Sequence, residues 1–209
     1  MWFKRETIGR IFTNSYDHAE FMKLLFVIPP QIIRSLDGID CAPTVSIPLG
    51  SLYMASYLRK MEWEGEFRVY DARLGAEFNS YEDGTKTFGD AWSKVKSEIE
   101  NYAPQVVAIS NMFSWQIDGA LETARTVKKN FPEMVTVLGG PHASSFPLKM
   151  IEEEALDYVV MGEGEQRLYE LILTLENGDK ISAQGILGNS DDAELLRQKK
   201  KAPISFIQK

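Results

Sequence analysis

The sequence contains little cysteine and histidine. It contains one cysteine, Cys41, in 209 residues, so the chain can form neither an internal disulfide nor a cysteine-ligated cluster of its own. Its two histidines, His18 and His142, lie far apart in the sequence, and we expect no zinc site or other metal site built by the chain alone. Any chemistry must then come from a bound organic cofactor, from an acid or base, or from a partner.

The sequence also lacks a long apolar run, and it has few basic clusters. The longest apolar run, residues 24–30, is far shorter than the roughly 20 residues that a membrane span needs. No signal-peptide pattern follows the charged residues 1–10. The net charge is −7, and basic residues cluster only near the end, at 197–201. We therefore expect neither a membrane nor a nucleic acid as partner, and by default a cytoplasmic location.

The loop motifs of several common α/β proteins are absent. The first apolar run is followed by Pro29 and Pro30 rather than by the Gly-x-Gly-x-x-Gly of nicotinamide sites. There is no phosphate-binding Gly-x-x-x-x-Gly-Lys loop and no Gly-x-Ser-x-Gly of hydrolases. The acidic cluster of phosphorelay receivers is missing as well, since the relevant runs end in Ile28 and Ser110.

What the sequence does contain is a regular alternation of short apolar runs and helical periods. The runs predict strands at 24–28, 67–70, 106–110, 135–138 and 158–160, with a sixth short strand at 184–187. Helices are predicted at 49–61, 88–102, 117–130, 148–154 and 166–177. The strand runs are apolar throughout, as burial on both faces requires. We predict an α/β fold with a doubly wound, mostly parallel five-stranded sheet of Rossmann-like or flavodoxin-like type.

The same pattern divides the chain into three parts. Residues 22–188 carry the strand and helix repeat and form one α/β domain. Residues 1–21 are mixed and polar, and we expect them to be an N-terminal extension. Residues 189–209 turn acidic, then basic, then mildly apolar, and we interpret them as a tail or as a linker to a catalytic domain outside this sequence.

Ligands of open parallel sheets bind beyond the carboxyl ends of the strands, where the strand order reverses. Four predicted loops at that edge are rich in glycine or small residues, and a large cofactor could approach their backbone closely. Glycines at tight turns are the alternative explanation. His142 is either an axial metal ligand or proton donor, or, as we favour, a loop residue bonded to backbone. For Glu163 and Glu165 we favour helix capping and cofactor contact over acid–base catalysis, and we expect no catalytic residue.

Five segments together resemble the N-terminal, cobalamin-binding domain of cobalamin-dependent radical-SAM enzymes. They are Pro29-Pro30 and the segments 48–60, 104–110, 137–144 and 157–165. The resemblance implies a cobalamin whose nucleotide tail is buried among the strand ends. The cofactor-binding residues that it implies, together with the four loops, are Pro30, Leu49, Gly50, Ser110, Asn111, Met112, Gly139, Gly140, Pro141, His142, Gly162, Glu163, Gly164 and Glu165.

The resemblance also implies how the cofactor is used. Other cobalamin domains coordinate cobalt through the histidine of an Asp-x-His-x-x-Gly motif, and Pro29-Pro30-Gln31 offers no such ligand, so a base-off cofactor without a histidine from this chain is implied. The Cys-x-x-x-Cys-x-x-Cys loop of the radical-SAM barrel is absent. The iron–sulfur cluster and S-adenosylmethionine would therefore belong to a barrel, fused or supplied in trans, to which this domain presents cobalamin for methyl transfer or a related radical reaction.

Two other functions remain open from the sequence: an interaction domain that has lost its cofactor, and a stand-alone cobalamin carrier or sensor. A direct test of the pocket is a bulky side chain at Gly140. We expect Gly140→Leu to weaken cobalamin binding by more than about tenfold, or about 1.4 kcal/mol, while leaving the stability of the fold largely intact.

Overall fold

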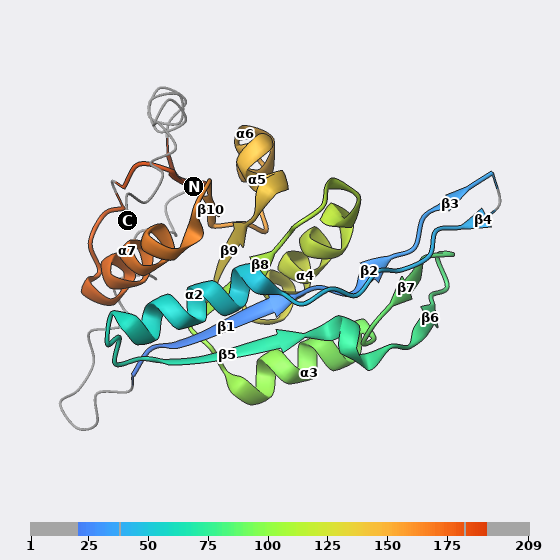
Figure 1. Ribbon diagram of the computed structural model, residues 1–209, viewed down its shortest axis with the longest axis horizontal. Coiled ribbons are helices and arrows are strands. Elements are labelled where there is room, and N and C mark those ends of the chain that lie inside the picture. The colour runs from blue at the N-terminus through green and yellow to red at the C-terminus, as the bar shows by residue number, and fades with distance from the viewer. Residues whose placement is uncertain (1–20, 38, 182, 192–209) are drawn as a thin grey trace.

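The central feature of the computed structural model is a six-stranded sheet in the order β11-β10-β9-β8-β1-β5 (Figure 1). The model describes residues 21–37, 39–181 and 183–191. The strands of the sheet are β1 (Lys23–Ile28), β5 (Glu66–Asp71), β8 (Val106–Ser110), β9 (Val135–Gly139), β10 (Tyr158–Val160) and β11 (Ile186–Gly188). All neighbours pair in parallel except β10 and β11, which are antiparallel.

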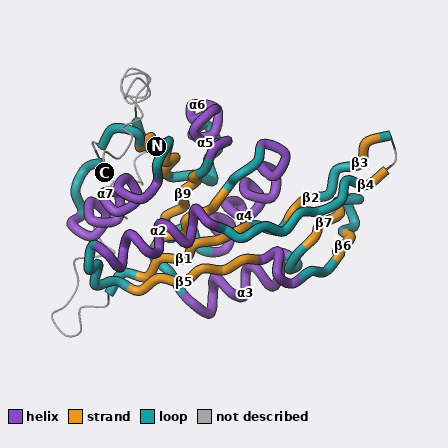
Figure 2. Tube along the Cα trace, in the orientation of Figure 1, coloured by secondary structure: helices purple, strands orange, loops and turns teal. Residues whose placement is uncertain are grey.

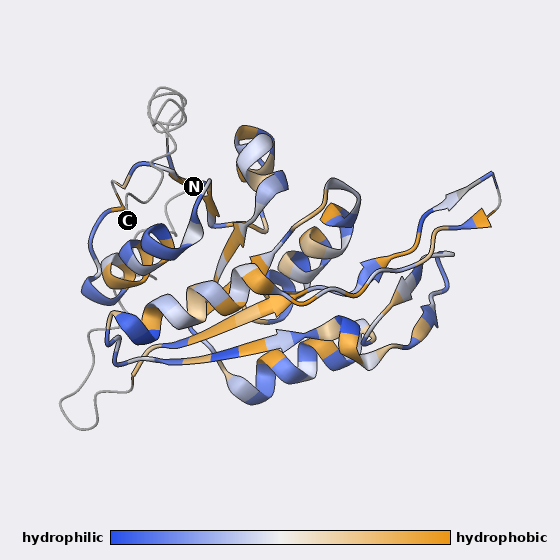
Figure 3. Ribbon diagram, in the orientation of Figure 1, coloured by the Kyte–Doolittle hydropathy of each residue, from blue (hydrophilic) through white to orange (hydrophobic). Residues whose placement is uncertain are grey.

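The central strands are apolar on both faces. In β1, Leu25 and Val27 belong to one buried cluster, while Leu24 and Phe26 belong to a second cluster on the other face. Phe26 lies in register with Val69 of β5 on one side and with Ala108 of β8 on the other. Figure 3 shows β1 as an almost continuous hydrophobic strand. Burial on both sides explains why the sequence lacks the polar alternation of a half-exposed strand.

Helices cover both faces of this sheet (Figure 2). On the face of Leu24 and Phe26 lie α2 (Leu49–Lys60) and α7 (Gly164–Asn177). Their neighbouring turns meet through Tyr57 and Tyr169, whose ring centroids are 6.2 Å apart. The opposite face is covered by α3 (Trp92–Tyr102), α4 (Ile117–Asn130), α5 (Pro141–Ser145) and α6 (Pro147–Ile151). The doubly wound, mostly parallel fold is confirmed.

Most predicted boundaries are met within two residues, and the larger differences concern β11, α3 and the segment of α5 and α6. The sixth strand exists, but it runs antiparallel as β11. The helix predicted to begin at residue 88 begins at Trp92, because Phe88 belongs to a strand and Gly89 turns the chain at φ +112°. The helix predicted at 148–154 is the shorter α6, and α5 before it was not predicted. Predictions that fall on residues 1–20 and 192–209 lie outside the described residues.

An antiparallel extension of the carboxyl edge was also not predicted. It contains β2 (Gln31–Ile32), β6 (Phe78–Ser80) and β7 (Lys86–Phe88) in one small sheet, and β3 (Ser35–Leu36) with β4 (Ile39–Asp40) in another. Figure 1 shows this extension projecting away from the main sheet. The buried Gln31 joins the start of segment 31–44 to its end. Its side-chain amide N–H donates to the Thr44 carbonyl, and its side-chain oxygen accepts from the Thr44 N–H. Strands of two or three residues carry no readable period in a sequence.

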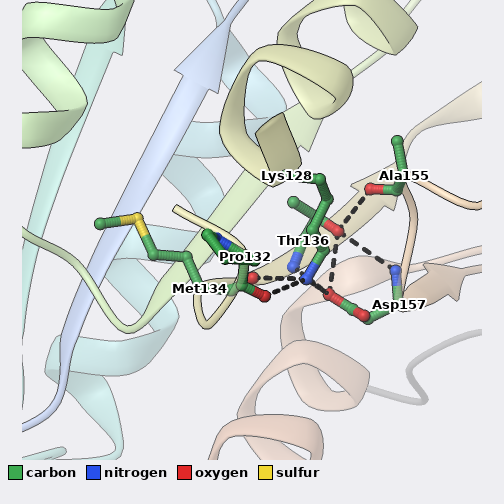
Figure 4. A network of polar contacts seen from close by, with 6 residues as sticks. All are labelled: Lys128, Pro132, Met134, Thr136, Ala155 and Asp157. Carbon is green, nitrogen blue, oxygen red and sulfur yellow. Dashed lines mark hydrogen bonds and ion pairs between the residues drawn. The ribbon is translucent and has the colours of Figure 1, made fainter. Parts of the chain in front are cut away.

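The amino ends of β9 and β10 are joined by a polar network (Figure 4). The Thr136 hydroxyl donates to the carbonyl of Ala155 at 2.7 Å, and the Thr136 N–H donates to Asp157 Oδ2 at 2.8 Å. Lys128 of α4 completes the network through an ion pair with Asp157 at 2.5 Å and a bond to the Met134 carbonyl at 2.6 Å. This network fixes the strand pair at the edge opposite to the glycine-rich loops.

Among the described residues, no helix combines the length and the apolar character that crossing a membrane would require.

Candidate functional site

A cavity of about 380 Å³ opens between the sheet and helices α2 and α7, at the carboxyl ends of β8, β9 and β10. Its floor includes Ala108, Val137 and Val160, one residue from each of these strands. Met54 of α2 and Leu168 of α7 line it from the helices. We call this cavity the slot. Its volume and its mainly apolar lining are typical of sites for small organic ligands or for part of a cofactor.

Two adjacent glycines shape the slot in different ways. A Cβ atom added at Gly139 would have no neighbour within 4 Å, so the absence of a side chain there leaves space free in the slot. Gly140 has φ +117°, and a Cβ there would lie 2.2 Å from the carbonyl oxygen of Asn111. The expectation that Gly140→Leu leaves stability intact is therefore wrong, because that backbone conformation and that contact both require glycine. Gly139 is the position at which bulk would act on the slot alone.

The rim of the slot is held by Ser144 of α5. Its hydroxyl donates to the Gly140 carbonyl at 3.0 Å and accepts from the Gly162 N–H at 2.8 Å. Through this one side chain, the turn after β9 and the turn after β10 are tied together. The shape of the opening is thus fixed by hydrogen bonds rather than by packing alone.

Two carboxylates, Glu163 and Glu165, lie where α7 begins and line the slot. Glu163 is the N-cap residue of α7, but its side chain makes no capping hydrogen bond, so the capping expected of it is not made. Glu165 lies in the first turn, where a negative charge is favourable. Its Oε2 atom is buried and has no hydrogen-bond partner within the described part of the chain.

The structure brings most of the predicted site residues together. Ten of them line the slot, namely Gly50, Ser110, Met112, Gly139, Gly140, Pro141, Gly162, Glu163, Gly164 and Glu165. Four others, Pro30, Leu49, Asn111 and His142, are not among its lining residues. The assignment of the ten to a cofactor stays a prediction.

Pro30 lies beside the gap between β1 and β8, where the strand order reverses. Only about 20 Å³ is open there, which is room for one water molecule. Arg73, which is 5 % exposed, helps to fill this gap. Its guanidinium pairs with Asp71 at 2.7 Å and donates to the Ser46 carbonyl at 2.7 Å. The general rule for open sheets predicts a ligand at this gap. The larger cavity lies instead over β8, β9 and β10.

The other predicted residues outside the slot have separate roles. Leu49 is 53 % exposed at the start of α2. Asn111 is buried, and its amide donates to the Phe113 carbonyl at 3.0 Å, bracing the loop after β8. Neither side chain is available to line the slot.

His142 is held by a side chain rather than by the backbone that we expected. Its Nδ1 shares a hydrogen bond of 2.8 Å with the Ser114 hydroxyl, and its ring centroid lies 5.0 Å from that of Phe146. Burial, and then the positive charge of Lys149, lower the pKa of His142 below 6.5. Within the described ranges, no group of three or more histidine, cysteine or acidic side chains is placed to hold a metal ion.

Sequence reasoning missed part of the lining: Met54, Ala108, Ile109, Val137, Ser144, Val160 and Leu168. The three floor residues could have been predicted from the sequence. Ala108 and Val137 each lie two residues before the end of a strand and Val160 lies at the end of one, and all three lie on one face of the sheet. No comparable signal marked Met54 and Leu168, since their place depends on how two helices pack over the sheet.

Comparisons with known proteins find a matching family model and longer relatives. The family model described as B12 binding domain matches residues 36–172. The chain is 34% identical over 173 residues to an uncharacterized methyltransferase of Pyrococcus horikoshii, covering 81% of this chain and 32% of that protein. It is 31% identical over 149 residues to cytidylyl-2-hydroxyethylphosphonate methyltransferase of Streptomyces wedmorensis, covering 69% of this chain and 27% of that protein. The chain thus spans about a third or less of these relatives.

A solved structure shares the fold. The radical S-adenosylmethionine methyltransferase TsrM from Kitasatospora setae, with cobalamin and a [4Fe-4S] cluster bound, matches with a TM-score of 0.62 at 17% identity. The match covers 82% of this chain and 29% of that chain.

Proposed function

The chain belongs to the family of B12-binding domains, and from this membership we propose that it binds cobalamin with the cofactor's nucleotide tail in the slot. The observation that carries the proposal is the slot itself, a mainly apolar cavity of about 380 Å³ at the carboxyl ends of three parallel strands. The two relatives described above are named as methyltransferases and extend well beyond the region that matches this chain.

The residues present fit such a tail. Ala108, Val137 and Val160 offer a flat apolar floor for an aromatic base, and Met54 and Leu168 offer walls. Gly139 adds no side chain to this space. Burying a base among these groups removes apolar surface from water, which favours binding by about 25 cal/mol for each Å².

We further propose that cobalamin is held base-off, with no histidine of this chain on cobalt. A base seated in the slot is unavailable to the metal. Gln31, in β2, uses its side-chain amide to bond the backbone of Thr44. His142 lies outside the slot lining, and its Nδ1 is engaged with Ser114. When bound and methylated, the cofactor would supply the methyl group of a transfer reaction, while the chain holds the tail and excludes water from it.

The catalytic partner that we propose is a radical-SAM barrel, fused to this domain or supplied as a separate chain. The iron–sulfur cluster and S-adenosylmethionine would belong to that barrel, because a single cysteine cannot hold a cluster. In this arrangement residues 22–188 are the cobalamin domain and residues 189–209 lead toward the barrel. The relatives support the arrangement, since the matches cover only 27% and 32% of their lengths.

The test is binding of hydroxocobalamin to the purified chain, followed by desalting and a visible spectrum. We expect about one equivalent of corrinoid to remain with the protein. The bound cofactor is then reduced to cobalt(II). Its electron paramagnetic resonance spectrum should lack the nitrogen hyperfine splitting that a coordinated base or imidazole would cause. Protein that emerges colourless would overturn the proposal in favour of a cofactor-free interaction domain, and nitrogen splitting would overturn the base-off part.

A further inference from the structure

We propose that Glu165 recognises the nucleotide tail by accepting a hydrogen bond from a hydroxyl group of its ribose. This inference rests on the proposed function. It names Glu165 as the residue by which the chain would distinguish an intact cobalamin from a corrinoid without a nucleotide tail. The residue is a specificity determinant for binding.

The first observation is an unused acceptor. Glu165 lines the slot, and its Oε2 atom is buried with no hydrogen-bond partner in the described part of the chain. An unpaired buried acceptor costs about 1–3 kcal/mol, and more when it is charged. Proteins rarely keep such a group unless a ligand, ion or water pairs with it.

The second observation is that three donors close to the slot already have acceptors other than Glu165. The Ser144 hydroxyl donates a hydrogen bond to the Gly140 carbonyl, and the Gly162 N–H donates one to the Ser144 hydroxyl. The guanidinium of Arg167, in the same helix as Glu165, donates to the Met161 carbonyl. We infer that the donor for Glu165 enters through the slot, and that the carboxylate turns about its last side-chain bond to meet it, because Oε2 is buried in the structure as it stands.

The chemistry of the tail selects the ribose. Its benzimidazole base, attached to the ribose through one nitrogen, carries no N–H or O–H group. Its phosphodiester is an anion with acceptors only, and both Glu163 and Glu165 would repel it. The ribose hydroxyls are the donors that remain, and a hydroxyl paired with a carboxylate forms one of the stronger hydrogen bonds in proteins.

The experiment compares Glu165→Gln with Glu100→Gln, the same change at an exposed carboxylate of α3, which covers the face of the sheet opposite to the slot. Dissociation constants are measured for hydroxocobalamin and for cobinamide, which has the corrin ring but no nucleotide. We expect Glu165→Gln to weaken cobalamin binding by about tenfold, or about 1.4 kcal/mol. Cobinamide binding should stay within about twofold, and Glu100→Gln should change neither constant by more than that.

The outcomes separate the two proposals. If the wild-type chain binds no cobalamin, the proposed function fails. If it binds cobalamin, but Glu165→Gln weakens both corrinoids equally or neither, the contact with the ribose is refuted while cobalamin binding stands. Thermal unfolding without corrinoid is the control for folding: removing an unpaired buried charge should leave the melting temperature of Glu165→Gln equal to or above that of the wild type.

Discussion

The hydroxyl of Ser144 accepts a hydrogen bond of 2.8 Å from the backbone N–H of Gly162. The two residues are 18 positions apart: Ser144 lies in α5, which follows β9, and Gly162 lies in the turn that follows the neighbouring strand β10. Because the same hydroxyl also donates to the Gly140 carbonyl, one side chain sets the distance between the two turns that border the slot.

Replacing Ser144 with alanine should loosen this border. We expect Ser144→Ala to lower the free energy of unfolding by about 1–2 kcal/mol, because the Gly162 N–H loses its partner. Cobalamin affinity should fall by about three- to tenfold, as measured by spectroscopic titration. Ser145→Ala is the control, since Ser145 donates only to the Pro141 carbonyl one helical turn back and is exposed. Equal effects of the two substitutions would show that the bond to Gly162 does not shape the slot.

At Gly140, the backbone rather than the ligand should determine the effect of substitution. Gly140→Leu puts a branched side chain at φ +117° and against the Asn111 carbonyl, so we expect the free energy of unfolding to fall by more than about 2 kcal/mol. Chemical denaturation of the cofactor-free protein measures this directly. An unchanged midpoint would contradict the structure at this turn.

The network at the opposite edge predicts a purely structural effect. In Thr136→Val the carbonyl of Ala155 loses its bond from the hydroxyl in a fully buried site, and we expect a loss of about 1–3 kcal/mol of stability. Thr123→Val is the matched control. Thr123 is equally buried, but its hydroxyl bonds the Gly119 carbonyl within its own helix, so its loss should cost less. A control as costly as Thr136→Val would refute the importance of the network.

His142 should titrate below pH 6.5, because its burial and the charge of Lys149 both disfavour the protonated ring. The unfolded chain then binds the proton more readily than the folded chain, so the stability from this residue is present above pH 6.5 and is lost as the pH falls below it. Proton NMR of a His18→Gln variant isolates the ring signals of His142. Lys149→Gln should raise its pKa, and a wild-type pKa at or above 6.5 would contradict the assignment.

Much of the sheet was predictable because buried parallel strands are apolar throughout. The run at 106–110 matches β8 at both ends, and the predicted helix at 117–130 matches α4. The predicted loop glycines did converge on one cavity, because carboxyl ends of parallel strands share an edge.

Other features depend on packing that a single sequence does not encode locally. Nothing in the sequence around Pro30 indicates that Arg73, some 40 residues away and paired with Asp71, helps to fill the gap beside it. Likewise, Gly139 and Gly140 look equivalent in sequence, and only their surroundings show that one leaves space and the other permits a turn.

The most direct test of the slot is the amount of hydroxocobalamin that remains bound after gel filtration to the wild type, to Gly139→Leu and to Ser97→Leu. Gly139→Leu adds bulk where a Cβ meets nothing within 4 Å, whereas Ser97 is exposed on α3, across the sheet. We predict about one equivalent with the wild type and Ser97→Leu, and binding weakened at least about tenfold in Gly139→Leu, which should remain folded. Equal retention by all three proteins would contradict the account, because cobalamin would then bind elsewhere.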